Sequence, residues 1–387
     1  MDTVKVGHGR ECITPPMGIK MAGYGARTEG VADVHDDLFL NAVVLESQDH
    51  KVALLTYDLC GLNAKMVAEI KSAIRDDTGL EPGQILMNWS HTHSGPALGR
   101  KEPDESQKAY WGDLTRKSVR ALGAALEDTA PATLSAGAAP VDIGCNRRVR
   151  REDGVTALGH NPDGPTLHEM TVWRLARSDK PDVVLFSTPM HGTVLGGWSL
   201  TISAEWMGRA RERLETEMPN TRFVFLQSCG ADQDPYYTVR SEFRMRGTFG
   251  ELEQHGKAAA TSVRQALEEM HEVNALPLRS VLQSIELPPK EEDGEPQQLP
   301  LHGVRLGDAM IAALGCEAVV EYALFGRKVS PAKETLVLGY SNGWMGYLPT
   351  ADMHPEGGLE VERSRVAPES EQIVKDAMQQ LFQELAG

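Results

Sequence analysis

Short apolar runs recur along the chain and are separated by polar or glycine-containing turns. Each run is rich in Val, Ile, Leu and Phe, and each is too short for a typical buried helix. Runs of this length and composition are typical of β-strands. We therefore predict strands at residues 38–47, 51–59, 84–90, 182–190, 222–230 and 334–342.

Helical periodicity appears between several of these runs. Met66, Ile70 and Ile74 recur at every fourth position, which places them on one face of a helix. Ser203 is followed closely by the acidic Glu205, which is typical of a helix N-terminus. Because strands and helices alternate, the predicted fold class is α/β, with mixed β-sheets flanked by helices. We predict helices at residues 64–77, 203–218, 251–270 and 369–385.

One acidic, proline-rich stretch shows neither an apolar strand-like run nor helical periodicity. Residues 288–303, PPKEEDGEPQQLPLHG, predict an exposed loop or linker. A chain of 387 residues is long enough for two domains. However, the candidate chemistry lies on both sides of this loop, so we expect a single catalytic domain over residues 1–387.

Composition narrows the class of partner. The formal net charge of -16 repels phosphate backbones and anionic headgroups, so we expect neither nucleic acid nor a membrane surface as a partner. No apolar run approaches the roughly 20 residues that span a bilayer, and the N-terminus lacks a signal-peptide pattern. The five cysteines are scattered and odd in number, which indicates reduced thiols. We predict a cytoplasmic protein with a small-molecule substrate, and a homo-oligomer stays open.

Side chains that bind metals collect where the predicted strands end. In α/β sheets, ligands bind beyond the carboxyl ends of the strands. Neutral imidazole is a common zinc ligand, and a catalytic zinc has about three protein ligands. The pattern suits a zinc site and also suits hydrogen-bonded structural histidines, and both interpretations stay open at this point. The residues concerned are Asp58, His91, His93, His191, Asp232 and Asp234.

Several motifs follow one another in an order known from one enzyme family. Together they resemble the catalytic domain of the neutral/alkaline non-lysosomal ceramidases. The resemblance extends over nearly the whole chain, because the N-terminal ITPP and GYG segments and residues 161–175 are also similar to that family. The main motifs are SHTHSGP at 90–96, HGTVLGG at 191–197, ISAEW at 202–206, FLQSCGADQDP at 225–235 and GYSNGWMGYLPT at 339–350.

The resemblance implies the fold of that family and a zinc-dependent amidohydrolase activity. One Zn²⁺ would be held by two histidines, a glutamate and a tyrosine. His93 would lie at the site without binding the metal and would transfer a proton, and Arg147 would face the substrate. The ligands implied by the resemblance are His91, His191, Glu317 and Tyr347.

This sequence also departs from the family. Asp234 stands where the ceramidases have a serine that takes part in catalysis, and Leu359 stands where they have a tyrosine. Asp234 would act as a base toward water, orient a substrate amine, or merely form a turn before Pro235. We expect the C-terminal domain of the ceramidases to be absent, because the chain ends soon after the catalytic portion. Asp58 is predicted to hold a histidine ring N–H or to cap a helix, and Asp232 to lie near the ligands or the substrate.

These observations lead to a functional hypothesis. We expect a zinc-dependent hydrolase that cleaves an amide (N-acyl) bond of a small soluble substrate through a metal-activated water. Ceramide is a bilayer lipid and nothing in the sequence looks like a membrane-docking surface, so we expect a different substrate. Two alternatives stay open: an esterase or lactonase that uses the same metal site, and a non-catalytic binding protein with the ceramidase fold.

Overall fold

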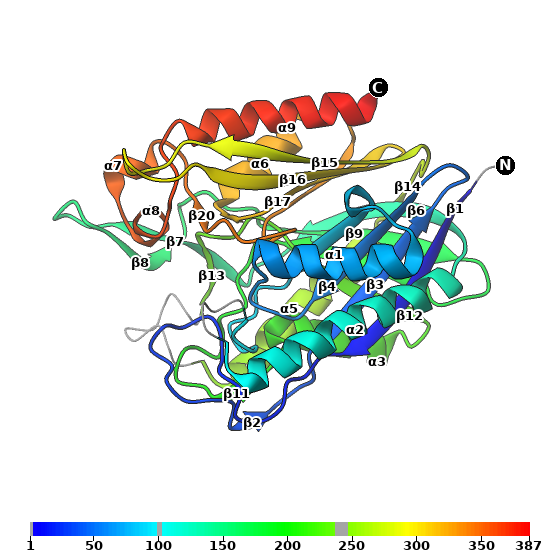
Figure 1. The fold of residues 1–387 in the computed structure, drawn as a ribbon, viewed down its shortest axis with the longest axis horizontal. Helices are drawn as coiled ribbons and strands as arrows, with labels where there is room; N and C mark the ends of the chain where they lie inside the picture. The colour runs from blue at the N-terminus through cyan, green and yellow to red at the C-terminus, as the bar shows by residue number, and fades with distance from the viewer. Residues whose placement is uncertain (1–2, 99–102, 237–246) are drawn as a thin grey trace.

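The protein is built of four layers, as the computed structural model in Figure 1 shows for residues 3–98, 103–236 and 247–387. Helices α1, α2, α3 and α5 cover one face of a nine-stranded sheet. The other face of that sheet packs on a four-stranded sheet, whose outer face is covered by α6 and α9. The α-helices are α1 (Ala64–Thr78), α2 (Glu105–Glu127), α3 (Glu205–Glu217), α5 (Phe249–Glu268), α6 (Val320–Val329), α7 (Met353–Glu356), α8 (Leu359–Glu362) and α9 (Ser370–Ala386).

The nine-stranded sheet is mixed. Its strand order is β12-β10-β9-β6-β1-β3-β4-β5, and β14 pairs with β6. β5 runs parallel to β4 and β12 runs parallel to β10, whereas the other neighbouring pairs are antiparallel. The strands are β1 (Val4–Cys12), β3 (Phe39–Glu46), β4 (Lys51–Tyr57), β5 (Ile85–Trp89), β6 (Ala130–Pro140), β9 (Glu169–Arg177), β10 (Asp182–Thr188), β12 (Thr221–Gln227) and β14 (His271–Val273).

Both faces of this sheet are buried, and β3 shows how the sequence achieves this. Leu40, Ala42 and Val44 belong to the core under α1 and α2. Val43 and Leu45 belong to the core between the two sheets. Because successive side chains of a strand point to opposite faces, a strand covered on both faces has a mainly apolar sequence, which Asn41 alone interrupts between Phe39 and Leu45.

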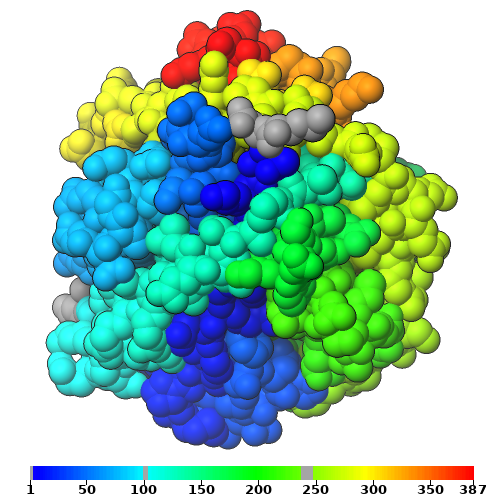
Figure 2. All heavy atoms as spheres, turned by 90° about the vertical axis from the view of Figure 1, so that its right-hand side faces the viewer, coloured from blue at the N-terminus to red at the C-terminus, as the bar shows by residue number. Residues whose placement is uncertain are grey.

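The four-stranded sheet has the order β15 (Leu278–Leu287), β16 (Gln297–Leu306), β17 (Ala309–Leu314) and β19 (Glu334–Leu338). α9 packs across β15 and β16, and α6 packs on β19. Figure 2 shows the layers end on, with α9 in red above the yellow strands of this sheet and the cyan and green segments on the opposite side.

Short pairings place further segments at one end of the layers. The two-stranded sheets are β18 (Glu317–Ala318) with β20 (Tyr347–Leu348), and β2 (Asp33–Val34) with β11 (Thr201–Ile202); the three-stranded sheet is β13 (Gln233–Pro235) with β7 (Gly144–Arg150) and β8 (Thr156–Asn161).

The segment that follows β19 lies between the ends of two edge strands of the large sheet. Ser341 forms a bridge with Asn88 next to the end of β5, and Leu338 forms one with Ser228 after β12. The Asn88 side chain fastens the junction, because it accepts a hydrogen bond from the backbone N–H of Gln227 at 2.8 Å and donates one to a backbone carbonyl of the β19 segment at 2.9 Å. This junction brings the ends of β5, β12 and β19 to one place.

The structure confirms all six predicted strands and all four predicted helices, with ends shifted by a few residues. It also contains a long helix, α2, that we did not predict. Its buried face includes small or polar residues such as Ser118 and Ala121, so the apolar stripe is weak. This face lies very close to β1, where a Cβ on Gly9 would come within 2.0 Å of the carbonyl oxygen of Ala121.

The prediction of an exposed loop over residues 288–303 is wrong in its second half. Residues 297–303 belong to β16, which pairs with β15 on one side and β17 on the other. Leu299 and Leu301 are fully buried there, and Pro300 between them, together with the polar residues on either side, hid the strand pattern. None of the described helices has the length and apolar character needed to cross a membrane.

Candidate metal centre

Three segments that are distant in sequence bring metal-binding side chains together. His91 follows β5 and His191 follows β10. A parallel bridge between Thr92 and Gly192 holds these two segments side by side. Glu317 begins β18, where its backbone N–H donates to a carbonyl in the loop before β20 at 2.9 Å. The candidate centre therefore lies at the carboxyl ends of the strands, as the sequence predicted.

The donor atoms of these three residues lie within 4.8 Å of one another. Glu317 Oε1 is 3.0 Å from His191 Nε2 and 3.4 Å from His91 Nε2. Ligands about 2.1 Å from a tetrahedral metal are roughly 3.4 Å apart, so this spacing suits a shared cation. Two imidazoles and a carboxylate are also donors that zinc and related divalent metals accept.

The far nitrogen of each imidazole fixes its tautomer. His91 Nδ1 lies 2.7 Å from the carbonyl oxygen of Cys60, and His191 Nδ1 lies 2.9 Å from that of Gln233. A carbonyl only accepts, so each Nδ1 carries the proton and donates it. Each Nε2 then faces Glu317 and is the nitrogen that can bind a metal or take up a proton. Metal-binding histidines are commonly oriented in this way by a backbone carbonyl.

Buried charge at the centre is not balanced by a fixed cation. His91, His191 and Glu317 are at most 1% exposed. Burial raises the pKa of Glu317, but the two imidazoles more than offset this and hold its pKa well below its usual range. Burial lowers the pKa of His91, but Cys60 and Glu317 more than offset this and raise it to about 10. Without a metal, the ionised carboxylate is therefore balanced by a protonated imidazole, and a bound cation would take the place of that proton.

Backbone strain accompanies the centre. His91 has a φ of 56°, Tyr340 a φ of 50° and Asn342 a φ of 55°, all in the left-handed region that non-glycine residues rarely adopt. Each such residue costs on the order of 1–3 kcal/mol and persists only where the surroundings impose it. At His91 this conformation turns the backbone away from the direction of β5 and places the imidazole ring in the centre.

Two tyrosines lie beside the three donors. Tyr347 is the register partner of Glu317 in the β18–β20 pair. Burial and Glu317 both raise the pKa of Tyr347, while Arg147 opposes them. The ring of Tyr340 packs on His91 with their centroids 4.4 Å apart, and its buried hydroxyl has no hydrogen-bond partner among the described residues. The structure thus brings Tyr347 next to the centre and adds Tyr340, which sequence reasoning missed.

His93 adjoins the three-donor group without being part of it. Its Nε2 is 3.1 Å from His91 Nε2, and its ring packs edge-on against Tyr24. Burial lowers the pKa of His93 well below its usual value, and the other two histidines lower it further. Gly23 fits against this ring because a Cβ there would lie 2.5 Å from His93 Cβ. His93, Cys60 and His91 form a second, overlapping group of donors.

A network of buried ion pairs lies next to the centre. Arg147 Nε is 2.9 Å from Glu360 Oε1, and Arg147 Nη1 is 3.2 Å from Asp234 Oδ1. Arg148 Nη1 donates to the other Glu360 oxygen at 2.7 Å. Asp234 Oδ1 also lies 3.9 Å from His191 Nδ1. The predicted site residues Arg147 and Asp234 therefore lie together beside the centre. Glu360 was missed, although it directly follows Leu359.

Asp58 and Asp232 lie outside the group of donors. Asp58 accepts from the Phe39 backbone N–H at 2.9 Å and from Arg211 at 2.8 Å. The predicted ring N–H bond of Asp58 is absent, because backbone carbonyls accept from both ligand histidines. The cap of α1 is Asn63, so the second prediction for Asp58 is also wrong.

Asp232 instead holds the chain that follows Glu317. Its Oδ1 accepts from the Val320 backbone N–H at 3.0 Å, and its Oδ2 accepts from the Asn146 amide at 2.7 Å. Asp232 therefore fixes the start of α6. Neither of these two hydrogen bonds involves a ligand histidine. Its contribution to the centre is made through the backbone near Glu317.

A small cavity of about 240 Å³ lies near the start of α1, and none of the candidate ligands lines it. Cys60 and Trp344 line it together with Leu62 and Leu98. Trp344 stacks on the His91 ring with centroids 5.5 Å apart, and it is 36% exposed. The cavity therefore ends next to a candidate ligand and suits a small, partly apolar substrate group.

Comparison with known proteins identifies the fold. No family model matches the sequence. Among solved structures, the chain is similar to a ceramidase complexed with C2, with a TM-score of 0.83 and 16% identity, over 100% of this chain and 75% of the other. It is also similar to neutral ceramidase from Pseudomonas aeruginosa, with a TM-score of 0.80 and 16% identity, over 100% of this chain and 74% of the other. The resemblance predicted from the motifs is confirmed: this chain has the fold of the neutral ceramidases.

Proposed function

We propose that this protein is a metal-dependent hydrolase that cleaves an amide (N-acyl) bond of a small soluble substrate. The observation that carries the proposal is the convergence of two imidazole Nε2 atoms and one carboxylate oxygen, within 3.4 Å of Glu317 Oε1. Both imidazoles have their remaining nitrogen bound to a carbonyl, so their Nε2 atoms face the same point. The fold shared with neutral ceramidases supports the same class of reaction.

The proposed holder of the metal consists of His91, His191, Glu317 and Tyr347. We propose one zinc ion, because two nitrogen and two oxygen donors suit zinc, and because zinc can expand its coordination to take up a water beside them. When bound, such a cation lowers the pKa of a water and polarises a substrate carbonyl. The residues of the chain hold this cation in place, and other side chains beside it accept and donate the protons of the reaction.

Proton transfer is assigned to two residues that adjoin the centre. His93 Nε2 lies 3.1 Å from His91 Nε2, and the low pKa of His93 keeps its ring neutral at rest. We assign His93 to take up a proton during the attack of water and to hand it to the departing amine. Asp234, 3.9 Å from His191, is assigned to take a proton from the attacking water. Arg147 fixes Asp234 through their 3.2 Å ion pair and turns its remaining nitrogen toward the Tyr347 side of the site.

The reaction class is tested with matched substrates. We expect the metal-loaded enzyme to hydrolyse N-acyl amines and N-acyl amino acids, and a chelator to abolish this activity until zinc is restored. Aryl esters and lactones with the same acyl groups form the comparison panel. Turnover of the esters with every amide inert would replace the proposal by the esterase alternative. Full metal occupancy without turnover of either class would favour a binding protein.

The fourth ligand is tested with a pair of variants that remove one hydroxyl each. Tyr347→Phe should weaken metal binding, because it deletes the oxygen assigned to the metal. Tyr340→Phe is the control, since its ring packs on His91 while its hydroxyl is not assigned to the metal. Metal titration of both variants decides between them, and weaker binding in Tyr340→Phe alone would reassign the ligand.

A further inference from the structure

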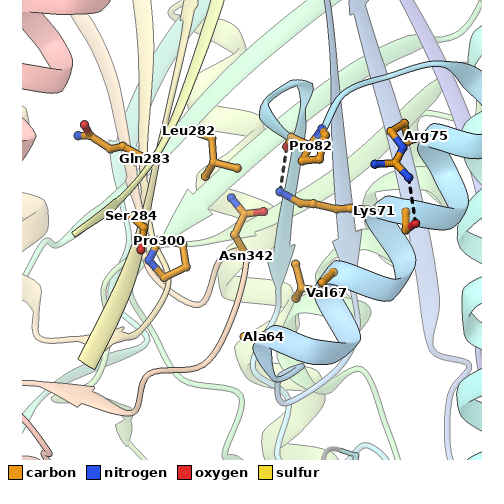
Figure 3. A pocket seen from close by; sticks show the side chains of 12 residues that line it. Ala64, Val67, Lys71, Arg75, Pro82, Leu282, Gln283, Ser284, Pro300 and Asn342 are labelled. Atoms are coloured by element: carbon orange, nitrogen blue, oxygen red, sulfur yellow. Dashed lines mark hydrogen bonds between the residues drawn. The ribbon is translucent and has the colours of Figure 1, made fainter. Parts of the chain in front are cut away.

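A second cavity lies between α1 and the strands β15 and β16, and none of the candidate metal ligands lines it. Its volume of about 450 Å³ falls in the range of small-molecule sites. Figure 3 shows Val67 and Lys71 entering from α1, Leu282 and Pro300 from the two strands, and Asn342 from the loop after β19. The walls are mainly apolar.

Lys71 is the unusual residue of this cavity. It is only 5% exposed, and its Nζ makes one hydrogen bond, to the carbonyl oxygen of Pro82 at 3.1 Å. An ammonium group has three protons to donate. Among the residues that the structure describes, no carboxylate forms an ion pair with Lys71. By contrast, Arg75 on the next turn of α1 has Asp76 as a partner at 3.1 Å.

The neighbours of Lys71 supply no negative charge. His302 donates from Nε2 to the Gly83 carbonyl at 3.0 Å and accepts at Nδ1 from the Asn342 amide at 2.9 Å. This ring is therefore neutral, and burial together with Lys71 lowers the pKa of His302 to about 3. Burial likewise lowers the pKa of Lys71 to about 7. A buried amine with no counter-charge is costly unless an anion joins it.

We propose that this cavity binds a small monocarboxylate with an apolar chain, independently of the hydrolase site. The carboxylate pairs with Lys71 Nζ and accepts the two protons that Pro82 leaves free. The chain lies against Leu282, Pro300 and Val67. The charged head matches the buried amine of Lys71, and the apolar tail matches the apolar walls. An inorganic anion would pair with the amine but leave the walls uncovered. An alcohol would cover the walls but bring no charge to the amine.

Isothermal titration of the full chain with octanoate tests this proposal. Octanol and acetate serve as probes for the tail and the head alone. We expect octanoate to bind, and Lys71→Met to weaken it by at least about tenfold, because the bond to a charged group is lost. Lys65→Met is the matched control on the same helix, since the Lys65 side chain is 85% exposed and pairs with Glu69. It should bind octanoate like the wild type.

A carboxylate can also bind a metal, so the titration is run on metal-loaded and on chelator-treated protein. Binding by the Lys71 cavity should be equal in both. Octanoate binding that disappears with the metal, or that survives Lys71→Met, would overturn the proposal, as would no binding at all. Should Lys71→Met fail to fold, Ala68→Trp provides a second test. Ala68 is an exposed residue of the cavity wall, so the indole should block octanoate without disturbing the core.

Discussion

Two clusters of buried charge lie next to each other in this protein, and they differ in how their charges are balanced. Glu360 is fully buried and accepts from the guanidinium groups of both Arg147 and Arg148. Glu317 is just as buried but faces two imidazoles, which carry no positive charge unless they take up a proton. The arginine cluster carries its own permanent positive charge, whereas the histidine cluster needs either a proton on an imidazole or a bound cation. This difference separates a structural ion-pair network from a candidate metal site.

The largest effect is expected from Glu317→Gln. The amide keeps the shape but loses the charge, so metal affinity should fall by more than about 100-fold, beyond the 10–100-fold that partners outside the ligand sphere contribute. Activity should be lost with the metal, while circular dichroism shows a folded chain. Glu362→Gln, on the exposed side of α8, is the control and should keep its metal. Full metal content in Glu317→Gln would contradict the distinction between the histidine cluster and the arginine cluster.

His93→Ala separates a residue that moves protons from one that holds metal. We expect this variant to keep its metal and to lose kcat by roughly 10²–10⁴-fold, as expected for the loss of a general acid. Metal analysis and steady-state kinetics on the same preparation check both points. Loss of metal here, with retention in His91→Ala, would mean that the roles of the two histidines are exchanged.

Glu360→Gln tests the other cluster. It leaves Arg147 and Arg148 buried with an incomplete set of partners, so the free energy of unfolding should fall by about 3–5 kcal/mol. Urea unfolding at neutral pH measures this loss. The metal content should stay near the wild-type value, because Glu360 is not among the donors. A variant that is stable but metal-free would assign Glu360 to the metal and remove the distinction between the clusters.

A smaller, pH-dependent effect is expected from Glu205. This buried carboxyl accepts from the backbone N–H groups of Val194 and Leu195 at 3.0 and 2.9 Å and so holds the loop after His191. Burial raises the pKa of Glu205 to about 7, although the backbone donors oppose this. The native state therefore keeps a proton that the unfolded chain releases above its ordinary pKa of about 4.3.

The sign of this effect follows from the proton balance. The stabilisation is fully present below pH of about 4.3 and is lost as the pH rises to about 7. The free energy of unfolding should fall over this window by at most about 3–4 kcal/mol, and Glu205→Gln should flatten that part of the profile. Urea unfolding of metal-free protein across the window tests this. An equal slope in the variant would assign the effect to another group.

The sequence predicted some of the elements whose burial is simple, but it missed β17, which is apolar and buried along its whole length. Strands covered on both faces, such as β3 and β10, appear as mainly apolar runs because burial on both faces disfavours polar residues, although Asn41 of β3 is buried. β16 was missed because Pro300 and several polar residues interrupt its pattern, although both neighbouring strands pair with it. α2 was missed because it packs close to β1 through small residues, and a stripe of Ala and Ser carries little periodic signal.

The candidate site divides in the same way. His91, His191 and Glu317 were found because their motifs resemble a known family, and the structure brings these three together. What the sequence could not predict is which partner each polar group takes. Asp58 pairs with Arg211, and the ring N–H groups of His91 and His191 donate to backbone carbonyls. Such choices depend on the three-dimensional positions of backbone atoms, which leave no mark on residue type.

Diffraction from crystals of the zinc-loaded protein, recorded on both sides of the zinc absorption edge, tests the central claim most directly. The account predicts one anomalous peak within about 2.3 Å of His91 Nε2, His191 Nε2 and a carboxylate oxygen of Glu317. The peak should vanish in Glu317→Gln and persist in Glu360→Gln. A zinc-loaded crystal with no peak between these three side chains, or with its peak beside Glu360, would contradict the account.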